Sequence, residues 1–253
     1  MTLVSHDHRF IFLKTQKTAG TALEMALEPF CAPPGHKPKH WTQARVSAHG
    51  IIGARGLNVV DDDTAWFGHQ PAADIRAALG DNTFDRYTKL TVLRNPFDKV
   101  ISWFHWKRDK SGKALKHETR DETIAAFRRS LRQVHRGGAL TRFAALDWDV
   151  CAIDGDLVLD RVLRTETLPY DLWSFAHDRR LDPARLCMEQ PKTAARARDT
   201  ITVPDYYDAR SERIVHDAFA WVFEIGDYSR QAADAGRATE TLATASAMAV
   251  AAE

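Results

Sequence analysis

Several features are missing from the 253-residue sequence, and each absence excludes a class of protein. No apolar run approaches the roughly 20 residues that a transmembrane helix needs, and Met1 to Arg9 lacks the apolar centre of a signal peptide. We therefore expect a soluble, cytoplasmic protein. The 3 cysteines (Cys31, Cys151 and Cys187) are widely spaced and odd in number, which indicates reduced thiols and no disulfide framework. No metal-ligand spacing such as Cys-x-x-Cys occurs, so we expect no metal centre.

Charge and composition narrow the class of partner. The formal net charge is +1 at pH 7, so no overall field favours binding to nucleic acid or to a membrane surface. Hydrophobic residues at 44% and charged residues at 27% are typical of a globular protein, and the length suits one α/β domain or two small ones. We expect a single domain over residues 1–228. The tail at residues 229–253 is rich in alanine and threonine, and we expect it to be disordered or frayed.

The most informative stretch runs from Phe10 to Leu27. An apolar run at residues 10–13 predicts a buried strand, and residues 14–17 form a polar turn. Residues 21–27 predict a helix that Pro29 stops. The order of strand, turn and helix N-terminus is typical of a site for a phosphate-like anion.

The turn itself carries residues suited to an anion. The first N–H groups of a helix have no internal partner, and the helix dipole adds about half a positive charge there. Thr18 or Thr21 is expected to cap the helix, and Gly20 would let the backbone approach a ligand. Lys17 adds a full positive charge. The alternative interpretation is an ordinary turn with a solvated lysine.

This stretch is not a Walker A loop. That motif places a lysine after its second glycine and then a serine or threonine that holds magnesium. Here Lys17 precedes Gly20, and no serine or threonine follows a Gly-Lys pair. A P-loop phosphotransferase that depends on ATP and magnesium is therefore a minor alternative.

Two later segments place polar residues after predicted strands. Residues 64–67 predict a short strand, which His69 and a helix over residues 71–79 follow. Residues 90–93 predict a buried strand that leads directly into Arg94, and Ser102 lies about two turns into the next helix. Because the carboxyl ends of parallel strands form one crevice, we expect Arg94 and His69 to lie in the same crevice as the first turn.

Together these motifs resemble those of the sulfotransferases that use 3′-phosphoadenosine 5′-phosphosulfate (PAPS). Residues 14–21, Lys-Thr-Gln-Lys-Thr-Ala-Gly-Thr, look like the family's 5′-phosphosulfate loop, whose usual form is Pro-Lys-Thr-Ala-Gly-Thr-Ser. Gln16 stands for the proline and Ala22 for the last serine. Arg94 and Ser102 have the spacing of the 3′-phosphate motif. The resemblance covers residues 8–228 and points to soluble bacterial members of the carbohydrate type.

The resemblance implies a fold and a reaction. The fold would be a P-loop NTPase-like three-layer α/β sandwich with a central parallel sheet between helices. The reaction would transfer a sulfonate group from PAPS to an acceptor hydroxyl on a carbohydrate or another polar or anionic molecule, with 3′-phosphoadenosine 5′-phosphate (PAP) as product and no metal. A non-catalytic protein that binds a nucleotide or a sulfated glycan is the main alternative. The implied cofactor-binding residues are Lys14, Lys17, Thr18, Ala19, Gly20, Thr21, Arg94 and Ser102.

The resemblance also assigns the catalytic groups. Lys17 would stabilise the charge that develops on the leaving phosphate. His69, whose unperturbed pKa of about 6.5 suits proton transfer near neutrality, would accept the acceptor's proton. His40, His49 and Asp63 remain alternative bases, because some members use a carboxylate.

The remaining segments predict further structure but little chemistry. An amphipathic helix is expected at residues 122–134, a strand at residues 157–168 and a closing helix from residue 206 to about 226. Residues 139–156 show no clear period, and we expect a loop-rich segment near the acceptor. The basic loop at residues 189–201 is a weak candidate for phosphate contact.

Overall fold

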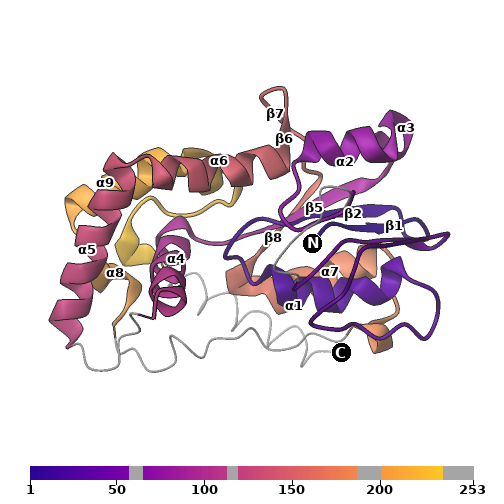
Figure 1. Cartoon of the computed structure of the whole chain (residues 1–253), viewed down its shortest axis with the longest axis horizontal. Helices are drawn as coiled ribbons and strands as arrows, with labels where there is room; N and C mark the ends of the chain where they lie inside the picture. Colours follow the sequence, from indigo (N-terminus) through magenta and orange to yellow (C-terminus); the bar gives the residue numbers. More distant parts are fainter. Residues whose placement is uncertain (57–64, 113–118, 187–200, 236–253) are drawn as a thin grey trace. The chain divides into compact units, whose positions relative to one another are not determined.

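The computed structural model describes residues 1–56, 65–112, 119–186 and 201–235, and it divides into two compact units (Figure 1). Each unit is described by itself. Unit 1 comprises Met1–Val92, Leu146–Leu163 and Leu168–Pro191, and unit 2 comprises Leu93–Ala145, Arg164–Thr167 and Lys192–Glu253. A single domain over residues 1–228 stays a prediction.

A six-stranded sheet in the order β3-β4-β1-β2-β5-β8 runs through unit 1. Its central pair, β2 (Phe10–Leu13) and β5 (Thr88–Leu93), is parallel, as the sequence predicts for these two strands. The sheet as a whole is mixed, because the chain returns from β1 to β2 through a short turn, and short turns join only antiparallel strands. The other strands of the sheet are β1 (Leu3–Ser5), β3 (Arg45–Ser47), β4 (Gly50–Ile52) and β8 (Arg161–Arg164).

Helices cover both faces of this sheet in unit 1 (Figure 1). Phe10 and Phe12 of β2 face α1 (Gly20–Leu27) and α7 (Leu168–Asp178), and residues of all three elements belong to one buried cluster. On the opposite face lie α2 (Ala72–Leu79) and α3 (Asp81–Arg86). The α/β class is therefore confirmed. A small two-stranded sheet pairs β6 (Ala152–Ile153) with β7 (Asp156–Leu157).

Unit 2 is helical, and aromatic side chains fill its centre. Phe97 lies edge-on to Tyr207 and Phe223, and Phe127 lies edge-on to Phe104. The helices expected after Arg94 and at residues 122–134 are present, but the single closing helix expected from residue 206 to about 226 is divided, because the chain leaves the helical conformation at Tyr207 and at Phe219. The helices of unit 2 are α4 (Pro96–Lys110), α5 (Arg120–Arg136), α8 (Val203–Tyr206), α9 (Ala209–Ala218) and α10 (Ala220–Ile225).

Residues 139–156 differ most from expectation. They contain α6 (Ala139–Cys151), which contributes residues 139–145 to unit 2 and residues 146–151 to unit 1. Its buried positions follow helical spacing, but one of them is Asp147, and this polar residue interrupts the apolar pattern that would have identified the helix.

Three smaller expectations also change. No threonine caps α1, because its N-cap residue is Ala19, whose left-handed backbone offers no side-chain oxygen. Residues 65–67 form no strand, although Trp66 and Phe67 accept backbone hydrogen bonds from Ala54 and Thr2. The strand predicted over residues 157–168 is confined to β8, because a 3₁₀ helix begins at Thr165. Further 3₁₀ turns lie at Glu28–Cys31, Pro183–Arg185 and Ala232–Asp234.

Several predicted features lie outside the described residues. These are Asp63, Cys187, most of the basic loop at residues 189–201 and most of the tail at residues 229–253. Among the helices that are described, none combines the length and apolar character needed to cross a membrane.

Candidate functional site

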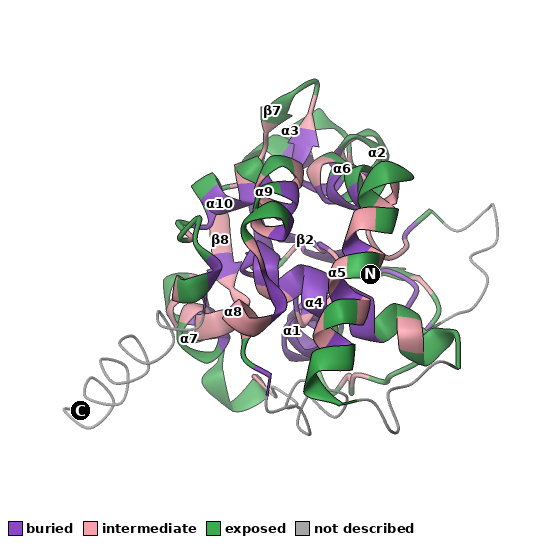
Figure 2. Ribbon diagram, turned by 90° about the vertical axis from the view of Figure 1, so that its left-hand side faces the viewer, coloured by how far each residue is buried: buried purple, intermediate pink, exposed green. Residues whose placement is uncertain are grey.

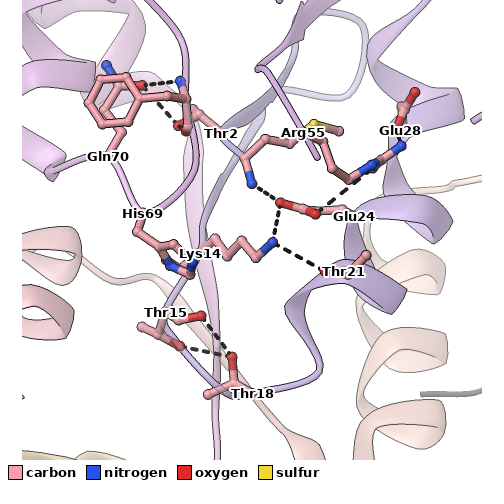
Figure 3. Close-up of polar contacts among 12 residues, drawn as sticks. Thr2, Lys14, Thr15, Thr18, Thr21, Glu24, Glu28, Arg55, His69 and Gln70 are labelled. Carbon is pink, nitrogen blue, oxygen red and sulfur yellow. Dashed lines mark hydrogen bonds and ion pairs between the residues drawn. The ribbon is translucent and has the colours of Figure 1, made fainter. Parts of the chain in front are cut away.

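The loop at residues 14–19 joins β2 to α1 and is held by buried hydrogen bonds. Thr15 Oγ1 donates to the carbonyl of Val92 at 2.5 Å, which ties the loop to the neighbouring strand β5. Thr18 Oγ1 donates to the carbonyl of Thr15 at 3.1 Å, which closes the loop on itself (Figure 3). Both threonine side chains are buried, so Thr18 shapes the loop with its hydroxyl. Any contact from Thr18 to a ligand would come from its N–H group.

A third anchor of the loop comes from α6. Asp147 is fully buried, and its Oδ1 accepts a hydrogen bond of 2.8 Å from the N–H of Gln16. A bond to an ionised acceptor is stronger than one between neutral groups. Asp147 therefore fixes the first turn of the loop from a segment more than 130 residues away in the sequence.

The loop backbone adopts a conformation that L residues rarely take. Lys17 has a φ of 59° and Ala19 a φ of 56°, both in the left-handed region. Neither residue is glycine, so each conformation costs on the order of 1–3 kcal/mol and persists only because the anchors enforce it. Strain of this kind is concentrated at binding sites, and here it turns the backbone just before α1.

The start of α1 has the donors that an anion site requires. Within the described part of the chain, no group accepts a hydrogen bond from the N–H of Ala19, Gly20 or Thr21. The rest of α1 is buried (Figure 2), so its dipole ends in a fixed position beneath the loop. These three N–H groups are the donors that the sequence predicts for the 5′ end of the donor nucleotide.

Lys14 lies against α1. Its Nζ is 2.9 Å from Glu24 Oε1 and 3.5 Å from Thr21 Oγ1 (Figure 3). Burial lowers the pKa of the Lys14 ammonium to about 8. The aliphatic part of the side chain covers Gly20, where an added Cβ would lie 2.9 Å from Lys14 Cε. The missing side chain of Gly20 thus makes room for Lys14, a role that the sequence did not suggest.

Glu24 is the centre of a buried cluster of charges. Its carboxylate is fully buried and contacts Lys14, the amino group of Met1 and, at 3.9 Å, Arg55. Arg55 also binds Glu28 at 2.6 Å. Glu24 Oε2 and Arg55 Nη1 nevertheless have no hydrogen-bond partner among the described residues. No sequence pattern indicates this cluster, because a glutamate within a short helix is ordinarily solvated.

His69 lies beside the start of the loop. Its Nδ1 is 3.0 Å from the carbonyl oxygen of Lys14, the last position before the turn (Figure 3). Because a carbonyl oxygen only accepts, Nδ1 carries the proton, and Nε2 has the lone pair in the neutral ring. His69 itself has a φ of 59°, and the hydrogen bonds of Gln70 to Thr2 and Phe67 hold this turn. His69 and the loop are thus brought together, as predicted.

The alternative bases His40 and His49 have other surroundings. His49 Nδ1 is 2.7 Å from Asp7 on the exposed turns that join neighbouring strands of the sheet. His40 lies on the exposed segment before β3. His69, by contrast, is hydrogen-bonded to Lys14 at the start of the loop.

The other two predicted cofactor residues, Arg94 and Ser102, belong to unit 2. Arg94 comes directly after β5, and both its Nε and its Nη2 lie 2.6 Å from Asp98 Oδ2. Ser102 is half-buried within α4. Glu166 holds the turn between β5 and α4, since its carboxylate accepts hydrogen bonds from the N–H of Asn95 and the hydroxyl of Tyr228. Burial raises the pKa of the Glu166 carboxyl.

The site residues therefore form two groups. Unit 1 contains residues 14–21 with His69, and unit 2 contains Arg94 with Ser102. Sequence reasoning missed Asp147 and Glu24. The spacing of Leu140, Phe143 and Val150 could have indicated α6 and placed Asp147 on its buried face, whereas no pattern indicates Glu24.

Comparisons with protein-family models, with curated proteins and with solved structures found no match for this chain. In the part of the chain that the structure describes, no group of three or more histidine, cysteine, aspartate or glutamate side chains is arranged to hold a metal ion.

Proposed function

We propose that the protein is a PAPS-dependent sulfotransferase with a P-loop NTPase-like fold, and that its acceptor is a hydroxyl on a carbohydrate or another polar or anionic molecule. The observation that carries this proposal is the strained loop before α1. Its left-handed residues Lys17 and Ala19 turn the backbone just before α1, and the N–H groups of Ala19, Gly20 and Thr21 have no acceptor among the described residues. That arrangement suits the phosphate of a donor.

The loop would act on the leaving group. PAPS would supply the sulfonate and its 5′-phosphate as leaving group, and the bond that breaks joins sulfur to a phosphate oxygen. Negative charge grows on that oxygen in the transition state, so fixed donors at the loop lower the barrier without having to reorganise. Lys17 supplies a charge at the same turn. The three anchors of the loop keep these donors in place.

His69 would accept the proton of the acceptor hydroxyl. The carbonyl of Lys14 fixes Nδ1 as the protonated nitrogen, so Nε2 is the basic one. The new bond joins the acceptor oxygen to sulfur, and the proton passes to Nε2. Because His69 is hydrogen-bonded to Lys14, the first residue after β2, the base and the anion loop lie at the same end of this strand.

Arg94 and Ser102 would hold the 3′-phosphate, which positions the donor without taking part in the chemistry. This assignment rests on the spacing of the motif. The fork of Arg94 binds Asp98, and a guanidinium aligned by a carboxylate presents its remaining N–H groups in a fixed direction.

One observation favours a second candidate, a non-catalytic protein that binds a nucleotide or a sulfated glycan. Two of the cations assigned to the donor already have carboxylate partners, because Lys14 binds Glu24 and Arg94 binds Asp98. Such pairs would reduce the net positive charge that these two residues offer to a donor. This candidate predicts binding of PAP with no transfer.

Titration calorimetry with PAP, combined with an assay of sulfonate transfer, tests the proposal. The assay incubates the protein with labelled PAPS and a pool of glycans and polar metabolites, and mass spectrometry detects the added sulfonate. We expect PAP to bind without magnesium and at least one acceptor to gain sulfonate. Binding without transfer would support the second candidate, and dependence on ATP and magnesium would support a phosphotransferase.

Two variants assign the roles. His69→Ala should lower turnover about a hundredfold while PAP binding stays intact, because general base catalysis contributes about 10²–10⁴-fold. Lys17→Ala should weaken both PAP binding and turnover. Near-normal turnover of His69→Ala would remove this residue from the mechanism, and unchanged activity of Lys17→Ala would contradict the assignment of the loop.

A further inference from the structure

A polar cavity lies within unit 1, at the end of the parallel strands opposite the loop. It has a volume of about 300 Å³, and Thr88, the first residue of β5, is part of its wall. Thr88 is opposite Phe10, the first residue of β2, whereas the loop follows the last residue of β2. A strand rises about 3.3 Å per residue, so the six residues of β5 put roughly 15–20 Å between the cavity and the loop.

The acidic residues of this cavity already have cationic partners. Asp160 accepts a hydrogen bond from the N–H of Lys89 and lies 2.9 Å from its Nζ. Asp178 lies 3.5 Å from Arg161, whose Nη2 also donates to Ser174. The third acid, Asp85, lies 3.9 Å from Arg76, which binds Asp81 more closely at 2.8 Å. Each carboxylate of the cavity thus has a cation nearby.

Two arginines of the cavity have no such compensation. Arg179 donates a hydrogen bond to the hydroxyl of Thr88, a neutral partner, and Arg86 is exposed. Among the described residues, neither guanidinium has a carboxylate within ion-pair distance. The cavity wall therefore holds two arginines that have no carboxylate partner of their own in the described part of the chain. Arginine forks match the oxygens of a phosphate or sulfate group.

Aromatic walls add a second element of recognition. Phe175 lines the cavity and is only 2% exposed, since it packs edge-on against Phe10 of the sheet. Tyr87 lines it as well, and its hydroxyl is 3.0 Å from His6 Nδ1, which holds the ring. A volume of about 300 Å³ is at the lower end of the range for small-molecule sites.

We propose that this cavity is a binding site for a small organic phosphate or sulfate monoester, whose oxyanion is bound by Arg86 and Arg179 and whose organic part packs against Tyr87. The site is separate from the loop and does not depend on the proposed sulfotransferase activity. A phosphate monoester carries up to two negative charges, one for each of these two arginines, whereas a sulfate monoester carries one.

Nuclear magnetic resonance of the full-length, ¹⁵N-labelled protein tests the site with phenyl phosphate, phenyl sulfate and phenol as probes. We expect saturable shifts of the Thr88 and Arg179 amides with phenyl phosphate, weaker binding of phenyl sulfate and none of phenol. Arg86→Gln and Arg179→Gln should each weaken phenyl phosphate binding by roughly tenfold or more, because each removes a hydrogen bond to a charged group.

Two control variants test whether phenyl phosphate binding depends on residues outside the cavity wall. Arg180→Gln changes an exposed arginine next to Arg179 that is not part of the cavity wall, and it should leave the affinity within about twofold. Lys17→Ala should leave these shifts unchanged, because the loop lies at the other end of the strands. Arg86→Gln alters an exposed side chain and is expected to fold, so affinity equal to the wild type in this variant would overturn the proposal. Phenol binding as tight as phenyl phosphate would do so as well.

Discussion

Asp147 offers the sharpest test of how the loop is held. Asp147→Ala removes the carboxylate that accepts the N–H of Gln16 at 2.8 Å, in a position that is fully buried. Water cannot replace the lost acceptor without entering the core. A hydrogen bond to a charged group contributes about 1.5–3 kcal/mol, which corresponds to roughly a 10- to 150-fold change in an equilibrium constant.

The loss of this hydrogen bond in Asp147→Ala should destabilise the loop more than any other part of the protein. Hydrogen exchange of the Gln16 amide reports the local opening of this bond, and we expect its protection to fall by about 10- to 150-fold in Asp147→Ala. Affinity for PAP should fall as well, because the left-handed residues after Gln16 lose one of their three anchors. Asp147→Asn keeps a neutral acceptor and should lie between Asp147→Ala and the wild type.

A matched control exists on the same helix. Asp149 is exposed, so Asp149→Ala removes an equal charge from α6 without touching the loop. In Asp149→Ala, the hydrogen-exchange protection of the Gln16 amide and the affinity for PAP should equal those of the wild type. If Asp147→Ala left both quantities unchanged, the loop would be held by its threonines alone, and our account of its strain would be incorrect.

Two further predictions concern stability. Gly20→Ala should lower the free energy of unfolding by about 1–3 kcal/mol in urea denaturation, because the new Cβ displaces Lys14 from the buried Glu24. Gly137→Ala is the control, because a Cβ at that position meets only a carbonyl oxygen at 3.4 Å. An equal loss of stability in both variants would refute this cause. For Glu166, burial raises the folded pKa above its unfolded value of about 4.5, so its contribution to stability is complete below that pH and is lost as the pH rises through the folded pKa. Glu166→Gln should remove this part of the pH dependence of the denaturation midpoint, and an unchanged pH profile would show that another group causes it.

The sequence predicts the elements around the loop better than the contacts that hold them. Strand β2, helix α1 and the turn between them follow from local periodicity and helix rules, which depend on residues within a few positions of one another. His69 lies beside the loop as predicted, although residues 65–67 do not form the strand from which this position was inferred.

The supporting residues could not be read in the same way. Asp147 and Glu24 act through contacts with residues distant in sequence. The residue type alone does not show whether a carboxylate is buried or solvated. The antiparallel strands β3 and β4 are only three residues long, too short to show a period. The left-handed backbone of Lys17 and Ala19 is likewise hidden, because local rules assign such φ values to glycine.

The partner of His69 Nδ1 is a peptide carbonyl, and this has a consequence for the ring as it gains and loses a proton. An imidazolium donates from both nitrogens, so the bond to Lys14 persists in the charged state as well as in the neutral one. A carboxylate in the same place would bind the charged ring far more tightly and hold the proton back. A neutral dipole orients the ring throughout the cycle and lets the proton depart to solvent.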